Sequence, residues 1–222
     1  MGNVGLFFVG IVLLVNGLVI LSVVPARSAA ILNLFVGVLQ VLLPTIILVQ
    51  SGGDAAILNA TWPTYLFGFT YLYYGLGILL NLEPQGLGWF SAFVAATALY
   101  EAAAALDTDP VFAVIWLCWA AMWTLFFLLM ALGIASLSRF TGWFLVWLGI
   151  PSCSISGLFL LNGAWNTTPA AGATAFVALL ALTAVSIAFT RSSIAQTPIG
   201  QSTDAASTPD ATVSTAESVP VA

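Results

Sequence analysis

Long apolar stretches follow one another along most of this chain, and each is close to the ~20 residues that a helix needs to cross a bilayer. Charged side chains make up only 5% of the 222 residues, and 61% of the residues are hydrophobic. A soluble domain carries about a quarter charged residues, so this chain could not cover its own surface in water. The sequence therefore predicts an all-α integral membrane protein, a polytopic helix bundle.

Short breaks rich in Gly, Pro, Asp, Asn and Ser divide the apolar sequence into seven predicted transmembrane helices. Their limits are 3–24, 29–50, 63–82, 88–106, 111–135, 141–162 and 171–190. The sixth is the weakest, because IPSCSISG interrupts it with Pro151. We expect residues 1–191 to form a transmembrane helix-bundle channel domain. Residues 192–222 are rich in Ser, Thr, Ala and Pro, which predicts a disordered cytoplasmic tail.

The only basic side chains are Arg27, Arg139 and Arg191, and seven spans would place all three on one side of the membrane. Cytoplasmic loops carry the excess of Arg and Lys in membrane proteins. We therefore expect a multi-pass protein with its N-terminus outside and its C-terminus in the cytoplasm. Three basic groups are also too few for a nucleic-acid partner.

The side chains needed for most enzyme sites are missing. The chain has no histidine, and its three basic residues are all arginine, so it has no lysine either. Ser-His-Asp and Cys-His arrangements are therefore excluded. Cys118 and Cys153 lie inside apolar segments and form no metal-binding pattern. We expect no enzyme activity, no metal and no cofactor.

The stretch FAVIWLCWAAMW places large aromatic side chains at Phe112, Trp116, Trp119 and Trp123. Gaps of four, three and four residues put all four on one face of a helix. At ~1.5 Å per residue, the tryptophans cover roughly 10 Å near the middle of the bilayer. Two other spans running in the same direction bring further groups to these depths. They are Val9, Leu13 and Asn16 in the first span, and Phe67 and Tyr71 in the third.

Two interpretations of this pattern stay open, packing between helices and the lining of a narrow path. Membrane helix interfaces favour small residues, and each indole carries an N–H that needs a partner. A neutral path between aromatic faces would accept flat, hydrogen-bonding solutes and exclude ions by desolvation.

Glu101 is the one ionisable residue well inside a predicted span, about five residues from its outer end. Either this carboxylate reaches the outer interface or a vestibule and is solvated, or it contacts the permeant or faces the interior of the subunit.

Six motifs carry a resemblance to the AmiS/UreI family, the bacterial short-chain amide and urea channels. They are VGIVLLVNG at 9–17, LNLFVGVLQ at 32–40, LFGFTYLYYG at 66–75, WFSAFVA at 89–95, VIWLCWAAMW at 114–123 and RFTGWF at 139–144. The resemblance covers roughly residues 1–150 and is closer to the amide-transporter branch than to the acid-gated urea channel. The motifs at 66–75 and 114–123 are specific to the family when both occur in one chain.

The resemblance implies a protomer of six helices in a bacterial inner membrane, and a homo-hexameric ring with lipid at its centre. It also implies which residues line the path of each protomer. These are Val9, Leu13, Asn16, Phe67, Tyr71, Phe112, Trp116, Trp119, Met122 and Trp123. Phe112 stands where the family has tryptophan and Met122 where it has leucine, so these two positions carry over less directly.

The chain also departs from the family pattern. Acid-gated members use titrating histidines and acids in longer outer loops, whereas this chain has no histidine and short outer loops. We therefore predict no histidine-based acid gate. A glutamate of the urea channel's sixth helix aligns with Leu148, and the seventh predicted span exceeds the family's six.

Together these features predict a passive channel or facilitator for small neutral amides, acetamide-like compounds first and urea as a further candidate. It would supply a cytoplasmic amidase or urease, whose hydrolysis keeps uptake downhill. Two alternatives stay open. One is a proton-coupled secondary transporter of small amides that uses Glu101, and the other is a structural or signalling membrane protein without a permeant.

Overall fold

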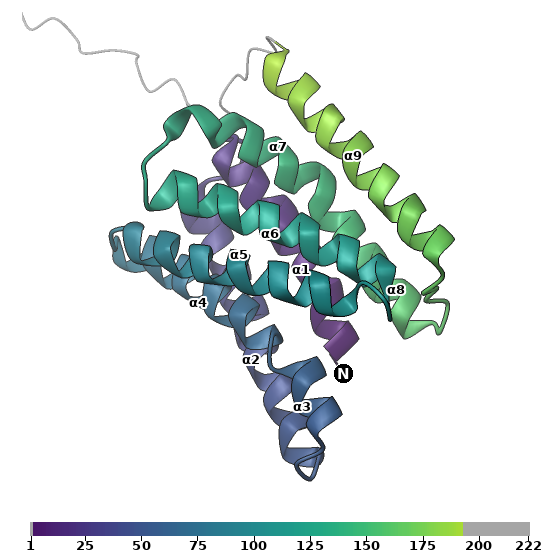
Figure 1. Ribbon diagram of the computed structural model, residues 1–222. Helices are drawn as coiled ribbons and strands as arrows, with labels where there is room; N and C mark the ends of the chain where they lie inside the picture. The colour runs from purple at the N-terminus through teal and green to yellow at the C-terminus, as the bar shows by residue number, and fades with distance from the viewer. Residues whose placement is uncertain (1, 193–222) are drawn as a thin grey trace, which may run out of the picture.

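The computed structural model describes residues 2–192, and every regular element among them is helical (Figure 1). The helices are α1 (Gly2–Ile20), α2 (Ala26–Gln50), α3 (Ala55–Thr61), α4 (Thr64–Leu80), α5 (Gln85–Ala105), α6 (Pro110–Met130), α7 (Ser138–Gly149), α8 (Ser156–Leu161) and α9 (Pro169–Arg191). The all-α class is confirmed. Residues 193–222, nearly all of the predicted tail, lie outside the described residues.

Six helical stretches of the described chain are long and apolar enough to cross a membrane. They are α1, α2, α5, α6, the stretch Ala135–Leu161 that contains α7 and α8, and α9. The predicted span 63–82 corresponds to α4, which has 17 residues. That length is at the lower limit of about 17 residues for a spanning helix. Length and composition thus support six of the seven predicted spans, and α4 stays a prediction.

The interrupted span 141–162 is continuous, with a π-helical segment at Ile150–Ile155 in its middle. Pro151 has no N–H to donate, and the segment forms the wider turn of a π-helix. Two serine hydroxyl groups donate to backbone carbonyls of this helix. Ser156 donates to the carbonyl of Pro151 at 3.0 Å, and Ser152 to the carbonyl four residues before it at 2.6 Å. The polar residues that weakened the sequence signal therefore satisfy the backbone of an irregular helix in an apolar environment.

Small residues bring several helices into close backbone contact. A Cβ atom at Gly17 of α1 would lie 2.7 Å from the carbonyl oxygen of Gly142 on α7. A Cβ atom at Gly37 of α2 would lie 2.9 Å from the amide nitrogen of Leu72 on α4. Such contacts are typical of membrane helix pairs. The interface of α4 with α6 differs, because it is formed by large aromatic side chains.

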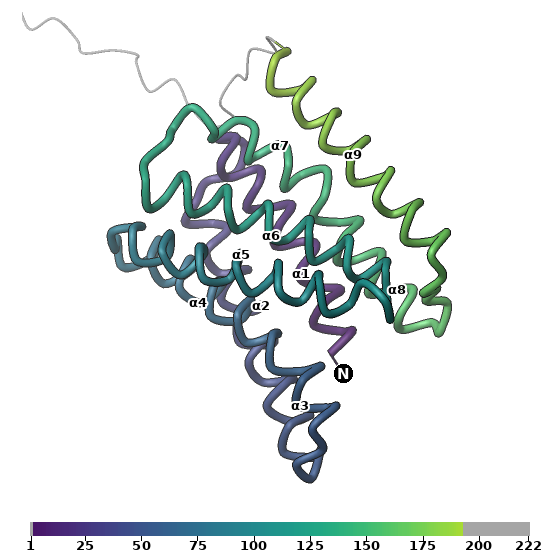
Figure 2. Tube along the Cα trace, in the orientation of Figure 1, coloured from purple at the N-terminus to yellow at the C-terminus, as the bar shows by residue number. Residues whose placement is uncertain are grey.

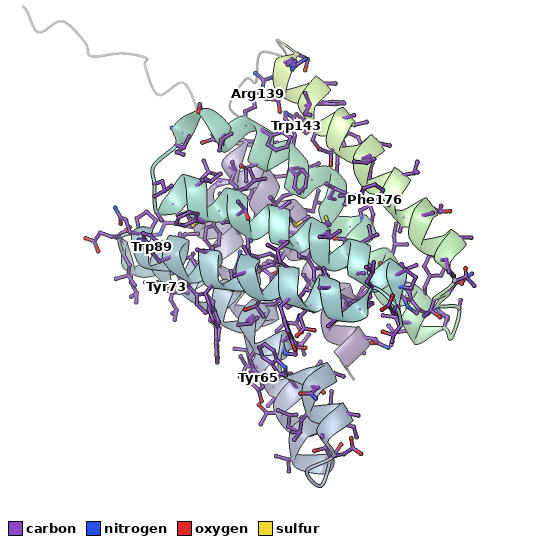
Figure 3. The ribbon with its side chains drawn as sticks, in the orientation of Figure 1. Tyr65, Tyr73, Trp89, Arg139, Trp143 and Phe176 are labelled. Carbon is purple, nitrogen blue, oxygen red and sulfur yellow. The ribbon has the colours of Figure 1, made fainter. Side chains whose placement is uncertain are left out.

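The core is formed by α1, α4, α5, α6 and α7, and Figure 2 shows α1 passing behind α5 and α6 in the middle of the bundle. α9 runs along the outside of the bundle, beside α7 and α6 (Figure 1). Phe189 of α9 packs against Trp143 of α7, with ring centroids 4.8 Å apart. The Arg139 guanidinium donates to the carbonyls of Phe189, at 3.4 Å, and of Ser192. Arg139 and the end of α9 therefore lie at the same end of the bundle (Figure 3).

Candidate functional site

A cavity of about 140 Å³ opens at the N-terminal ends of α1, α4 and α6, and we call it the aromatic cavity. It is lined by Gly2, Asn3, Leu6, Gln40, Ala60, Pro63, Thr64, Phe67, Phe112, Trp116 and Trp119. Four of the ten predicted lining residues are in this set, all of them aromatic. None of the described residues that line it is charged.

Phe67 lies at the centre of the aromatic cluster. Its ring centroid is 5.7 Å from that of Trp116, with a stacked angle of 23° between the planes. The same ring lies 5.0 Å from Trp119 and 5.0 Å from Trp123 at steep angles. The structure therefore brings the stripe of α6 against α4 at the depth where the sequence places Phe67. Edge-to-face and offset contacts of this kind hold the rings in fixed orientations.

A second cavity lies deeper in the bundle, and we call it the Asn16 cavity. Its lining residues are Asn16, Thr70, Tyr71, Tyr74, Leu87, Ser91, Phe126 and Met130. Its accessible space is about 10 Å³, close to what one water molecule needs. A larger cleft of about 400 Å³, lined in part by Arg27, shares three lining residues with the Asn16 cavity. They are Tyr74, Leu87 and Met130.

The two cavities lie in the same order along three helices. On α1, residues up to Leu6 line the aromatic cavity and Asn16 lines the Asn16 cavity. On α4 the lining passes from the first cavity to the second between Phe67 and Thr70, and on α6 between Trp119 and Phe126. Because helical position sets depth, the cavities lie one behind the other along the same direction through the bundle.

Buried side chains close the segment between the cavities. The predicted lining residues Val9, Leu13, Met122 and Trp123 are at most 2% exposed and belong to the lining of neither cavity. They occupy the intervening turns of α1 and α6. The described conformation is therefore closed at this level.

Asn16 is paired with a residue that the sequence analysis did not single out. Its amide nitrogen donates to Oδ1 of Asn33 at 2.9 Å, and the amide nitrogen of Asn33 donates back at 2.7 Å. Asn33 also donates to the carbonyl of Ala29 at 3.0 Å. Both side chains are buried, and a buried amide needs such partners. The available signal was polarity, since Asn33 is an amide inside an apolar span.

Hydroxyl groups accept from two of the tryptophans. The indole N–H of Trp119 donates to Ser152 at 3.3 Å, and that of Trp123 donates to Thr70 at 3.3 Å. These indoles are thus hydrogen-bonded within the protein, and sequence reasoning missed both partners. The hydroxyl of Tyr71, by contrast, is buried and has no partner among the described residues.

Glu101 and Leu148 lie apart from both cavities. Glu101 is half-buried on α5, and its carboxylate makes no ion pair or hydrogen bond with the described residues. It lines neither the aromatic cavity nor the Asn16 cavity. Leu148 is buried beside a separate apolar cavity of about 290 Å³ between α6, the π-helical segment and α9.

Comparison with known proteins gives consistent matches. The sequence pattern of the AmiS/UreI family of transporters matches residues 1–164. The protein named as transporter protein AmiS2 of Rhodococcus erythropolis is 53% identical over 184 residues, which cover 82% of this chain and 89% of that protein. A Mycolicibacterium smegmatis protein, named as a transporter of amidate substrates, is 42% identical over 191 residues, covering 85% of this chain and 89% of that protein.

More distant matches include a solved structure. The acid-activated urea channel of Helicobacter pylori is 30% identical over 190 residues, which cover 72% of this chain and 97% of the channel. The crystal structure of that organism's urea channel superposes with a TM-score of 0.69 at 30% identity, covering 75% of this chain and all of that one. The chain belongs to the AmiS/UreI family of transporters.

Proposed function

We propose that this protein is a passive channel for small neutral amides, acetamide-like compounds first and urea as a further candidate. The observation that carries the proposal is the alignment of the aromatic cavity with the Asn16 cavity, neither of which is lined by a charged residue. Support also comes from relatives named for the transport of amidate substrates and urea.

The chemistry of the lining suits such solutes. A primary amide is flat, so it can lie against Phe67 and the indoles that surround it. Asn16 and Tyr71 would supply hydrogen bonds at the second cavity, where the Tyr71 hydroxyl has no partner among the described residues. An ion would lose its hydration between aromatic rings without gaining a counter-charge, which is unfavourable.

Passage along this route requires the closed segment to open. Leu13, Met122 and Trp123 would have to move aside, by rotation of side chains or by a small displacement of α1 or α6. We propose that this opening is not controlled by a histidine, because the chain has none. It would therefore differ from the Helicobacter pylori relative, whose name describes acid activation.

Proton coupling through Glu101 is the alternative, and its position argues against it. A coupling carboxylate should contact the permeant or its path. Glu101 instead lies on α5, outside the lining of both cavities.

Acetamide uptake into proteoliposomes tests the proposal, measured by stopped-flow light scattering with and without a pH gradient. We expect wild-type flux above that of empty liposomes, unaffected by the gradient and retained in Glu101→Gln. Flux that requires the gradient, or is lost in Glu101→Gln, would establish coupled transport instead. Flux equal to that of empty liposomes for both acetamide and urea would exclude both transport functions.

The cellular arrangement is part of the same proposal. The protein would sit in a bacterial cell membrane as a homo-hexamer around central lipid, with the aromatic cavity outside and the three arginines and residues 192–222 in the cytoplasm. A cytoplasmic amidase or urease would consume the solute. Native mass spectrometry checks the hexamer, and labelling of single cysteines placed in the connections between helices, in intact cells, checks the orientation.

A further inference from the structure

We infer that Gln40 recognises the primary amide group of the permeant in the aromatic cavity, through a pair of hydrogen bonds. This inference rests on the proposed function and names a selectivity residue for it. Gln40 lies on α2, and none of the path-lining residues predicted from the sequence belongs to that helix. The side chain belongs to the lining of the aromatic cavity, together with Phe67, Trp116 and Trp119.

The amide oxygen of Gln40 is left without a hydrogen-bond partner among the described residues. The residue is only 2% exposed, and this oxygen is buried. Burying an amide oxygen in this way is unfavourable unless a donor is supplied. In the described conformation this oxygen lies against Gly5 of α1, so the amide has to turn toward the aromatic cavity before a solute N–H can supply that donor.

Two glycines position this side chain. Gly68 of α4 leaves space for the backbone of α2, since a Cβ atom there would lie 3.1 Å from the carbonyl oxygen of Gln40. Gly5 of α1 leaves space for the amide, because a Cβ atom at that position would overlap the oxygen of Gln40. The backbone is therefore fixed by α4, and the amide occupies room that only glycine on α1 provides.

The protein already contains the hydrogen-bond pair that we assign to Gln40. Asn16 and Asn33 face each other with each amide donating to the other, at 2.9 and 2.7 Å. A primary amide or urea carries the same C=O and N–H on one edge and can form the same pair with Gln40. The C=O and N–H on this edge lie in the plane of the amide. They can therefore still reach Gln40 when the amide lies flat against the neighbouring aromatic rings.

The pair also predicts what is discriminated against. A secondary amide in its usual trans form has its C=O and N–H on opposite edges, so it can make only one of the two hydrogen bonds with Gln40. Gln40 should therefore favour acetamide and urea over N-methylacetamide beyond any difference in size. A role confined to packing would not distinguish these solutes.

The test compares two permeants in proteoliposomes containing wild type or Gln40→Met, a change that keeps the length of the side chain and removes its hydrogen bonds. We expect acetamide permeability to fall about five- to hundredfold, the effect of losing both hydrogen bonds of the pair. N-methylacetamide permeability should change much less, so the ratio of the two falls. An equal change for both permeants, or no change in either, would overturn the inference.

A second variant reaches the same site from another helix. Gly5→Ala displaces the Gln40 amide without removing it, and it should lower the same permeability ratio. This variant decides the question if Gln40→Met does not assemble, and an unchanged ratio in it would overturn the inference. Wild-type acetamide flux separates the two claims, because its absence contradicts the proposed function, whereas normal flux with an unchanged ratio contradicts only the role of Gln40.

Discussion

α6 and α9 are similar in length and both apolar enough to cross a membrane, yet they occupy opposite environments. Over an apolar stretch of 18 residues in each helix, 61% of the residues are buried in α6 and 11% in α9. α6 presents its aromatic stripe to α4 and α1, whereas α9 lies on the outside of the bundle and follows the family match, which ends at residue 164. Apolarity therefore identifies membrane helices but does not say which of them forms the path. In this chain, large aromatic residues at helical spacing mark the helix that lines the aromatic cavity.

The largest expected effect separates the core of α6 from the surface of α9. Trp123 is fully buried against Phe67, so Trp123→Ala should lower the free energy of unfolding by about 3–5 kcal/mol. Phe176 of α9 is 44% exposed (Figure 3), and Phe176→Ala should cost less than about 1 kcal/mol, because lipid replaces the lost contacts. Thermal unfolding in detergent micelles measures both. Equal losses of unfolding free energy in the two variants would show that α6 is no more deeply packed than α9.

An intermediate effect concerns the buried amide pair. Asn33→Leu leaves Asn16 without its partner and should destabilise the fold by about 1–3 kcal/mol. The double variant Asn16→Leu with Asn33→Leu should cost less than the sum of the single changes, since neither amide is then left unpaired. Asn162→Leu, at an exposed position whose side chain bonds only to the carbonyl of Leu158, is the control. Additive losses would argue against a coupled pair.

A smaller effect than that of the amide pair is expected where α9 meets the bundle. Phe189→Ala removes the ring contacts with Trp143 and Trp147, whose centroids lie at 4.8 and 5.3 Å. The loss in unfolding free energy should be about 1 kcal/mol. Acetamide permeability should stay at the wild-type level, because Phe189 lines neither cavity. A variant that folds normally but loses permeability would assign α9 a part in the path.

Much of this arrangement follows from the sequence. The helix class and the breaks between helices are set by apolar length and by Gly, Pro and Asp. The expected approach of Phe67 to the tryptophans is found at centroid distances of 5.0–5.7 Å. The end of α6 was less predictable. The helix stops at Met130 rather than at 135, and Gly133 then takes a left-handed conformation with φ of 66°.

The residues that contact the predicted lining residues could not be predicted from the sequence. Asn33 and Gln40 are seven residues apart and share one face of α2, but the sequence does not give the rotation of that face toward α1. Ser152, which accepts from Trp119, lies in the π-helical segment, and residue spacing does not give the register of such a segment. The closure at Leu13 and Trp123 depends on packing, which residue spacing does not determine.

Chemical blocking of the aromatic cavity tests the proposed path most directly. Thr64→Cys places a thiol in the lining of that cavity, and Asn59→Cys places one nearby on the exposed face of α3. The native Cys118 and Cys153 are buried, so a bulky thiol reagent added after reconstitution should react at the introduced site. If amides pass through this cavity, labelling should lower the acetamide permeability of Thr64→Cys at least about tenfold and leave that of Asn59→Cys unchanged. Equal permeability of the two labelled variants would show that amides do not pass through this cavity.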